Sequence, residues 1–451
     1  MKKSKDWKRK SQKRKIEQQS NRVIDFVKII NHFFKNFSMW INEMSDGRHQ
    51  SYIKYSQADY LYMGIMKNVC GIESMCQMEE KFNTKECINT LKLISENEEL
   101  NEMPNMGSLN FYLEKLSPSN LRELRKKMIK TLIRNKTFYK ERLLNKYWKV
   151  IIDGTGLFSF KEKHCENCLV TTRINEDGKK VKRYYHKVVE AKLVLAPNIV
   201  ISLDTEFIEN ENENVEKQDC EINAAKRLLK RLKKDYPRLP MVIQGDALYA
   251  AETIMEICKI NNWKYIFTQK EERQKLIEES YEYIKEEENN EKEIEIGKEK
   301  GVSNYANNVD KVAGKKEKIN VYEYNYTKKG KKINFKWITN IEISNGNILE
   351  LIKTARGRWK IENEGFNNQK CGIYKIEHLN SRNNNAMKNH YLLTQISDIL
   401  MQLYLVSDKV KRELKESIKN TSSMLLECFR RQLITKEDVQ ETRRYTKVYL
   451  E

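Results

Sequence analysis

The sequence predicts an α/β protein in which a mixed sheet is flanked by helices, with a helical N-terminal domain and an insertion that contains β strands. Two observations predict this class. Apolar runs of strand length alternate with amphipathic helical segments between residues 148 and 270, which is typical of an α/β sheet. Before residue 148 the apolar residues recur at helical spacing, with few Gly or Pro interruptions.

The charge balance favours a polyanionic partner. The 84 Lys and Arg residues exceed the 64 Asp and Glu residues, which gives a formal net charge of +20. Phosphate contacts release condensed counterions, so this surplus predicts nucleic-acid binding, and a basic surface kept for solubility is the alternative. No apolar run reaches the roughly 20 residues that span a bilayer, and nine irregularly spaced cysteines suit a reducing compartment. We therefore expect a cytoplasmic protein with no membrane partner.

Changes in composition and periodicity divide the chain of 451 residues. The predicted parts are a basic disordered arm (1–15), a helical N-terminal DNA-binding domain (16–147), the first part of the α/β core (148–270), an insertion with β strands and a disordered acidic stretch (271–346), the second part of the core (347–405) and a helical C-terminal region (406–451).

The first part is a basic block. Residues 2–15 carry nine cationic side chains and one acidic one, and such blocks repel themselves and stay disordered until they are neutralised. We expect a DNA-binding arm that uses Lys8, Arg9, Lys10 and Arg14. A solubilising tail or a basic targeting signal would have the same composition.

Two aspartates follow apolar runs within the α/β region. Trp148 to Ile152 reads as a buried strand that delivers Asp153 at its tip, and residues 241–245 read as another that delivers Asp246. Loops at strand tips are where an α/β sheet presents reactive groups. The other predicted elements are strands at 188–195, 199–207 and 265–267, and helices at about 215–234 and 250–261.

Residues 352–370 predict a helix that carries a third acid. At about 100° per residue, Ile352, Ala355, Trp359 and Phe366 share one apolar arc, and Glu362 lies at its edge. An ion pair between Glu362 and the residue four positions before it would explain this placement without a site. Before this helix, alternating residues predict two strands in the insertion, at 322–326 and 333–337.

The three acids together supply what a two-metal site requires. Two divalent ions about 4 Å apart need several carboxylates to hold them. Hard oxygen ligands favour Mg²⁺ or Mn²⁺ over zinc.

The motifs around these acids resemble those of the insertion-sequence DDE transposases, which have a ribonuclease-H-like core. They are Asp153-Gly-Thr, Gly245-Asp246-Ala-Leu-Tyr and Arg358-Trp-Lys-Ile-Glu362. The separations of 93 and 116 residues between the acids are similar to those of the bacterial subgroup called insertion-sequence family four, which carries a β-rich insertion before its glutamate. The resemblance spans about residues 148 to 405.

The resemblance implies a DNA transposase that cuts transposon ends and joins the freed 3′-OH to target DNA. It implies that Asp153, Asp246 and Glu362 are catalytic and hold two Mg²⁺ or Mn²⁺ ions, one activating the nucleophile and the other steadying the leaving oxygen. Arg358 would contact a DNA phosphate. The implied partners are double-stranded DNA and a second copy of the chain in a synaptic dimer, within the bacterial cytoplasm and on the nucleoid when DNA is bound.

The sequence departs from the family pattern near its glutamate. Ala355 stands where the family commonly has Tyr, and Gln369 stands where it usually has Lys, with Lys370 one position later. We expect Lys370 to take the phosphate contact, and a divergent branch of the family. Two other functions remain open: a catalytically inactive DNA-binding relic or repressor, and a ribonuclease-H-like host nuclease.

Three weaker signals stay open. His164, Cys165 and Cys168 form a CxxC with a flanking histidine, and zinc binding there would need a further ligand such as His186. Two tryptophans, Trp337 and Trp359, suit either core packing or stacking on an unpaired base, and we expect core packing. The apolar helical run at 391–405 is predicted to cover the sheet.

Overall fold

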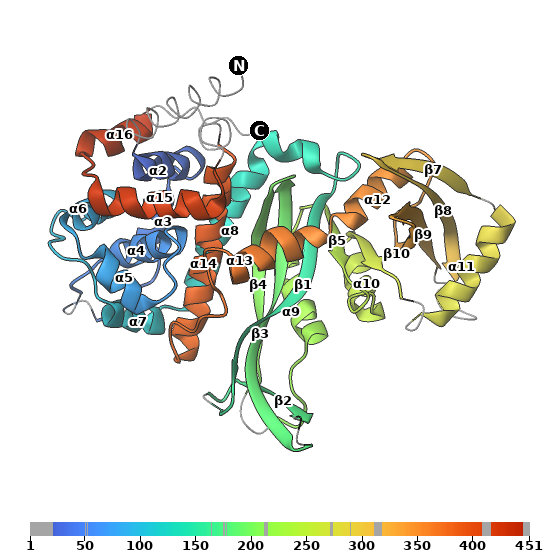
Figure 1. Ribbon diagram of the computed structural model, residues 1–451, viewed down its shortest axis with the longest axis horizontal. Coiled ribbons are helices and arrows are strands. Elements are labelled where there is room, and N and C mark those ends of the chain that lie inside the picture. The colour runs from blue at the N-terminus through green and yellow to red at the C-terminus, as the bar shows by residue number, and fades with distance from the viewer. Residues whose placement is uncertain are drawn as a thin grey trace.

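The computed structural model describes residues 21–49, 51, 53–163, 165–174, 176, 178–211, 215–270, 274–288, 290–310, 318–407 and 416–444. In Figure 1 a helical body lies on the left, a mixed sheet runs through the middle, and a smaller β-rich part lies on the right. The predicted basic arm at residues 1–15 lies outside the described residues.

The N-terminal part is helical, as predicted. Polar side chains begin its helices: Asn21 accepts hydrogen bonds from the N–H groups of Val23 and Ile24, and Ser56 forms a capping box with Asp59. The helices are α2 (Arg22–Phe33), α3 (Phe37–Asn42), α4 (Gln57–Val69), α5 (Met75–Phe82), α6 (Lys85–Ser95), α7 (Met106–Lys115) and α8 (Pro118–Arg134), followed by the 3₁₀ turn η2 (Lys136–Glu141).

The C-terminal helices return to this body. α15 (Ile418–Arg431) packs against α6, and α16 (Lys436–Arg444) packs against α2. Asn31 Nδ2 donates to Thr442 Oγ1 at 2.7 Å, and Asn89 Nδ2 donates to the carbonyl of Ile434 at 2.8 Å. The two ends of the described chain therefore fold as one helical unit.

A mixed sheet forms the centre of the molecule. Its core order is β4-β3-β1-β5-β6, where β3 is antiparallel to β4 and β1, and β1, β5 and β6 are parallel. This order has the ribonuclease-H-like form, so the predicted fold class is confirmed. The strands are β1 (Trp148–Phe160), β3 (Lys180–Ala196), β4 (Ile199–Ile208), β5 (Met241–Gly245) and β6 (Lys264–Thr268), connected through helices α9 (Glu221–Asp235) and α10 (Glu252–Ile260).

The long helix α14 (Asn384–Leu405) lies between the sheet and the helical body. It contacts β4 on one side and α4 and α7 on another. Gln402 Nε2 donates to the carbonyl of Val200 at 2.9 Å, and its Oε1 accepts from the N–H of the same residue at 2.7 Å. The apolar run at 391–405 thus covers β4, as predicted.

The insertion extends the sheet beyond β6. Antiparallel strands continue in the order β10-β9-β8-β7, so the whole sheet has ten strands, and the alternating runs predicted as strands are β9 and β10. Their bounds are β7 (Glu291–Ile296), β8 (Glu299–Asp310), β9 (Lys318–Lys328) and β10 (Lys331–Thr339).

The acidic stretch before β7 was predicted to be disordered, and this prediction is wrong. Residues 275–288 form α11 (Lys275–Glu288), in which Ile277 and Tyr281 are buried one turn apart. Lys336 of β10 pairs with Glu278 and, at 3.0 Å, with Glu282. Apolar burial at helical spacing and a cation from the neighbouring strand offset the repulsion that the acidic composition suggested.

The predicted helix at 352–370 is interrupted. α12 (Ile348–Arg356) ends at Gly357, after which the π-helical segment η4 (Ile361–Phe366) and α13 (Asn367–Cys371) follow. A turn and a π segment rotate the later side chains away from the arc of a regular α-helix. Trp359, predicted to pack in the core, is therefore 53% exposed, whereas Trp337 is buried as predicted.

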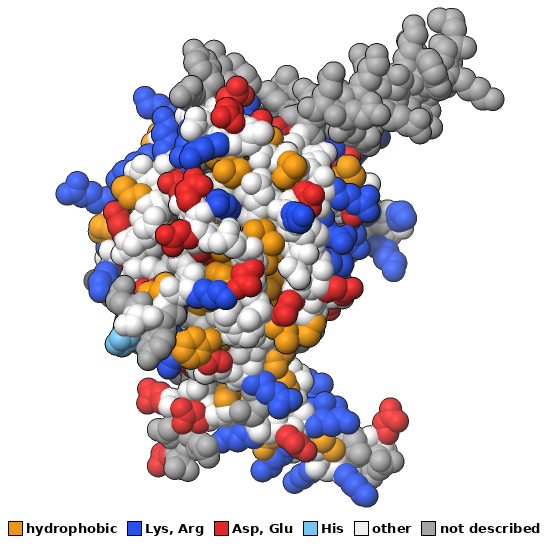
Figure 2. All heavy atoms as spheres, turned by 90° about the vertical axis from the view of Figure 1, so that its left-hand side faces the viewer, with side chains coloured by type: hydrophobic (Ala, Val, Ile, Leu, Met, Phe, Trp, Pro, Cys, Tyr) orange, Lys and Arg blue, Asp and Glu red, His pale blue; other side chains and the backbone are white. Residues whose placement is uncertain are grey.

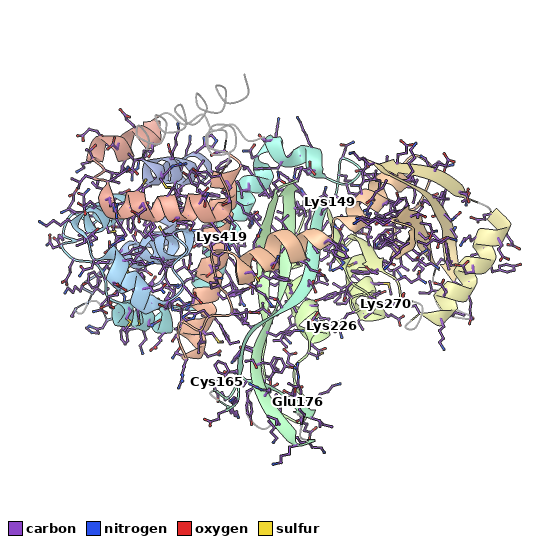
Figure 3. The ribbon with its side chains drawn as sticks, in the orientation of Figure 1. Lys149, Cys165, Glu176, Lys226, Lys270 and Lys419 are labelled. Carbon is purple, nitrogen blue, oxygen red and sulfur yellow. The ribbon has the colours of Figure 1, made fainter. Side chains whose placement is uncertain are left out.

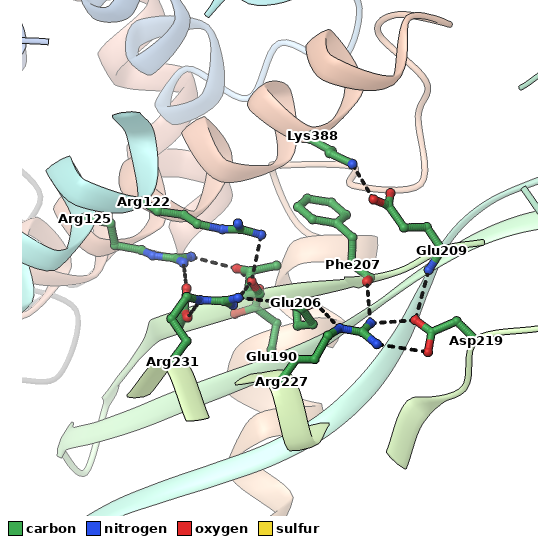
Figure 4. A network of polar contacts seen from close by, with 12 residues as sticks. Arg122, Arg125, Glu190, Glu206, Phe207, Glu209, Asp219, Arg227, Arg231 and Lys388 are labelled. Atoms are coloured by element: carbon green, nitrogen blue, oxygen red, sulfur yellow. Dashed lines mark hydrogen bonds and ion pairs between the residues drawn. The ribbon is translucent and has the colours of Figure 1, made fainter. Parts of the chain in front are cut away.

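A closed network of charged groups joins α8, β4 and α9 (Figure 4). Arg125 is 1% exposed and its Nη2 lies 2.7 Å from Asp204 Oδ1. Arg231 of α9 pairs with the other oxygen of the same aspartate and, at 2.6 Å, with Glu206. Further hydrogen bonds run from Arg125 to Ser202 and Thr205 and from these hydroxyls to Glu190.

A hairpin arm projects from the sheet (Figure 1). It is formed by β2 (Leu169–Ile174) and the paired first part of β3, and we call these residues, 169–174 and 180–186, the arm. Figure 2 shows acidic and basic side chains interspersed over the helical body, and side chains of both kinds on the projecting part below it. No helix within the described ranges is long and apolar enough to cross a membrane.

Candidate active site

Asp153 in β1 and Asp246, the residue that follows β5, lie at the same level of two neighbouring parallel strands. β1 and β5 pair from Trp148 with Met241 to Ile151 with Gln244, and the partners in each pair are 93 positions apart. The same number separates Asp153 from Asp246, so the register continued by two residues sets them opposite each other. Adjacent strands lie roughly 4.8 Å apart. The sheet thus presents two carboxylates at one point.

The strand that holds Asp153 does not end there, in contrast to the prediction. β1 continues to Phe160 because its pairing with β3 continues, with Asp153 opposite Glu190. What ends near Asp153 is the pairing with β5, whose last residue is Gly245. β1 therefore leaves its parallel neighbour at the level of the two aspartates.

A backbone N–H group holds one oxygen of each aspartate. Asp153 Oδ1 accepts from Gly154 N–H at 2.8 Å, and Asp246 Oδ1 accepts from Leu248 N–H at 2.8 Å. Each bond holds the side chain through its Oδ1 atom.

Arg358 connects Glu362 to this pair. Glu362 lies in η4 with 47% of its side chain exposed, and the Nη1 atom of Arg358 is 3.3 Å from its Oε1. The same Nη1 atom lies 3.9 Å from Asp153 Oδ2. The ion pair within the helix, which was the alternative explanation for this glutamate, is therefore present. The same guanidinium also links Glu362 to Asp153.

A further carboxylate, missed in the sequence, lies against the same point. Glu221 is the first residue of α9, and a Cβ atom added to Gly154 would lie 2.3 Å from its Oε2. Lys187 Nζ lies 2.6 Å from Glu221 Oε2, and the Tyr249 hydroxyl donates to Oε1 at 2.7 Å. In the sequence Glu221 looks like any acid in the first turn of a helix. The one hint is Gly154, whose missing side chain leaves room for it.

The crowding of carboxylates changes the titration of Asp153. Burial is the main cause that raises the pKa of Asp153, the Gly154 N–H and Arg358 lower it, and the charges of Asp246 and Glu221 add a smaller rise, so that the pKa is about 6. The site therefore holds more negative charge than its own cations compensate.

The three predicted metal ligands do not form a closed cluster. Across the described ranges, three His, Cys, Asp or Glu ligand atoms gather within 4.8 Å of one another only at Cys165, Cys168 and His186. Arg358, rather than a shared ligand, links Glu362 to Asp153. Glu362 must approach further before one pair of ions can be held by all three acids.

The residues predicted to bind DNA have different surroundings. Lys370 Nζ lies 2.9 Å from Glu377 Oε1 on the surface. Gln369, at the position where the resembled family has Lys, is buried and donates to Gln395 at 3.0 Å and Asp398 at 2.9 Å. Lys8, Arg9, Lys10 and Arg14 lie outside the described residues.

An aromatic cleft adjoins Arg358. It has a volume of about 890 Å³, and Trp359 and Trp337 line it together with Phe335 and Arg356. Phe335 and Trp337 are stacked with ring centroids 5.6 Å apart, and Arg356 lies over Phe335 at 5.9 Å. The cleft offers flat apolar surfaces and cations side by side.

No protein-family model matches this chain, and no curated protein matches it. Among solved structures, the cryo-EM structure of the piggyBac transposase synaptic complex with hairpin DNA is similar, with a TM-score of 0.44 and 11% identity, over 93% of this chain and 84% of that one.

Proposed function

We propose that this protein is a DNA transposase that performs metal-dependent phosphoryl transfer: cleavage at transposon ends and joining of the freed 3′-OH to target DNA. The observation that supports it most directly is the placement of three acids, Asp153, Asp246 and Glu362, from elements far apart in the chain. Two share one level of the sheet, and the third shares an arginine with the first.

The side chains fit divalent metal ions. Carboxylate oxygens are the ligands that Mg²⁺ and Mn²⁺ prefer. Burial, and to a smaller extent the charges of Asp246 and Glu221, raise the pKa of Asp153, and divalent cations would stabilise its ionised form. Asp153, Asp246 and Glu362 would hold them, with Glu362 moving closer. Two such ions would activate the attacking oxygen and stabilise the leaving one.

The groups around the acids suit a DNA strand. Arg358 compensates two carboxylates, and once metal ions take over that task its guanidinium is free to bind a phosphate in bidentate fashion. Trp359 is exposed at the neighbouring cleft, where its ring would stack on an unpaired base. The net charge of +20 favours association with DNA.

Membership of insertion-sequence family four, and a synaptic dimer, belong to the same proposal. They follow from the resemblance of the motifs around the three acids. Short inverted repeats flanking the reading frame would support them. Analytical ultracentrifugation with paired end DNA would show two chains per complex, and one chain per complex would contradict the dimer.

Substitution of the acids tests the proposal. Asp153→Asn, Asp246→Asn and Glu362→Gln are each expected to abolish strand cleavage of end-bearing DNA in Mg²⁺ while leaving DNA binding intact. Glu256→Gln, which removes an exposed acid from α10, is the matched control and should cut at the wild-type rate. Cleavage that persists in any of the three variants would remove that residue from the site.

The same assay separates the other two functions. A DNA-binding relic or repressor would bind the ends without cutting them in either Mg²⁺ or Mn²⁺. A host nuclease would cut without joining the 3′ end to a second DNA. Products in which end DNA is covalently joined to a target plasmid are expected only of a transposase.

A further inference from the structure

Two cysteines and a histidine meet at the base of the arm, away from the acids. Cys165 Sγ lies 3.2 Å from Cys168 Sγ, and His186 Nε2 lies 3.4 Å from the first thiol and 3.5 Å from the second. Cys168 and His186 are buried, and Cys165 is half-buried. Figure 3 places Cys165 beside the arm, where the chain turns from β1 into β2.

The dimensions of this triangle fit a tetrahedral metal ion. With Zn–S bonds of roughly 2.3 Å and Zn–N bonds of roughly 2.0 Å, ligands of a tetrahedron stand about 3.5 Å (S to N) to 3.8 Å (S to S) apart. The two sulfur–nitrogen distances agree with this, and the sulfur–sulfur distance is roughly half an ångström short. A disulfide would explain two thiols in contact, but it would not explain an imidazole nitrogen equally close to both.

The framework around the triad is built from three strands. His186 is fixed in β3, where the neighbouring Tyr185 pairs with Leu169 of β2. The loop before β2 is tied to the end of β4, because Asn210 Nδ2 donates to the Cys168 carbonyl at 3.1 Å and Asn167 Nδ2 donates to the Asn210 carbonyl at 2.9 Å. Such a backbone holds the ligands in place rather than leaving them on a free loop.

We propose that Cys165, Cys168 and His186 bind a zinc ion that fastens the β1–β2 connection to β3. Two thiolates and one imidazole favour zinc over Mg²⁺ or Ca²⁺, which prefer oxygen. Three protein ligands leave one position of the tetrahedron for water or a further ligand. His164 lies outside the described residues.

The position of the site indicates a structural role. His186 is followed in β3 by Lys187, the residue that pairs with Glu221 beside Asp153. The arm beyond the triad carries exposed cations, Arg173, Lys180 and Lys182. A zinc ion here would fix the angle at which this basic hairpin leaves the sheet, and would steady Lys187.

Metal content of the full-length protein tests the proposal. Protein expressed with added zinc and purified without chelators should contain about one zinc per chain by mass spectrometry of the metal. Cys165→Ser, Cys168→Ser and His186→Asn should each lose it, whereas Cys371→Ser and Cys76→Ser, which alter exposed cysteines outside the triad, should keep it. Zinc retained in the three variants, or absent from the wild type, overturns the site.

A second measurement on the wild-type chain guards against variants that fail to fold. Replacement of zinc by Co²⁺ should give the visible bands of tetrahedral cobalt together with a thiolate-to-metal charge-transfer band. Absence of the charge-transfer band, or a Cys165–Cys168 disulfide in metal-free protein, overturns the proposal. The outcome does not depend on transposase activity, because Asp153→Asn should be inactive and still hold its zinc.

Discussion

Two groups of charged side chains lie on the same sheet and differ in how their charge is compensated. In the network around β4, Asp204 meets both Arg125 and Arg231, and Glu206 meets both Arg227 and Arg231. Glu190 accepts from the hydroxyls of Ser202 and Thr205. At the candidate site Asp153, Asp246, Glu221 and Glu362 gather around two cations, Arg358 and Lys187. In the first group the charges compensate one another. In the second, four acids share only two cations among the described residues.

This difference separates a structural role from a ligand site. A closed buried network satisfies its own hydrogen bonds, and removing one member leaves the others without partners. An uncompensated group of acids costs stability in the free protein and gains it back when cations bind. Neutralising one charged residue should therefore lower the free energy of unfolding in the network around β4. At the candidate site it should leave the free energy of unfolding unchanged or raise it.

Asp246→Asn should have the largest effect on activity and little effect on stability. Loss of one ligand acid is expected to lower the cleavage rate on the order of 10³-fold or more, measured with end-bearing DNA in Mg²⁺. Its free energy of unfolding in urea should be equal to or above that of the wild type, because one negative charge leaves a crowded site. A fall in stability large enough to explain the lost activity would contradict this assignment.

Arg125→Met should have the largest effect on stability. It leaves Asp204 with one of its two arginines and removes donors from Ser202 and Thr205 in the interior. Breaking a buried pair of this kind costs about 3–5 kcal/mol, read from urea denaturation. Arg431→Met is the matched control, because Arg431 and its partner Glu427 are 74% and 41% exposed, and pairs of exposed charges contribute about 0–1 kcal/mol. Equal losses in the two variants would show that burial does not set the cost.

The aspartates were predictable from sequence because the signals are local. An apolar run of strand length followed by Asp marks Asp153 and Asp246, and their spacing of 93 residues is also the register of β1 on β5. The end of β1 was not predictable, since residues 153–160 stay in the strand through pairing with β3, a contact between distant segments.

The surroundings of the glutamate were less predictable. A regular helix with 100° per residue predicted a core position for Trp359. The turn at Gly357 and the π segment after it change the directions in which the later side chains leave the helix axis. The contact of Arg358 with Asp153 and the approach of Glu221 to Gly154 depend on how β1, α9 and η4 meet. No periodicity within one segment contains that information.

The pH dependence of stability should reveal the crowded site. The folded pKa of Asp153, about 6, lies above its ordinary value of 3.8, so the folded chain binds this proton more tightly than the unfolded chain. The resulting stabilisation is complete below pH 4 and is lost as the pH rises through 6, by on the order of 2 kcal/mol.

The free energy of unfolding, measured from pH 4 to pH 7 without divalent ions, should therefore fall relative to that of Asp153→Asn. Added Mg²⁺ should reduce the fall, because metal binding favours the ionised carboxylate. If the free energies of unfolding of the wild type and Asp153→Asn change with pH in parallel, the pKa of Asp153 is not raised.

Glu221→Gln should have the smallest effect, on the pKa of its neighbour. The Glu221 charge raises the pKa of Asp153, so its removal should lower the pH midpoint of the transition described above by less than about one unit. Tyr249→Phe is the matched control, because it removes a hydrogen bond to Glu221 and leaves the charge in place. If both variants shift the midpoint equally, Glu221 acts through the position of α9. If Glu221→Gln alone shifts it, Glu221 belongs electrostatically to the acid group, and the excess of negative charge at the site includes a residue that no motif marks.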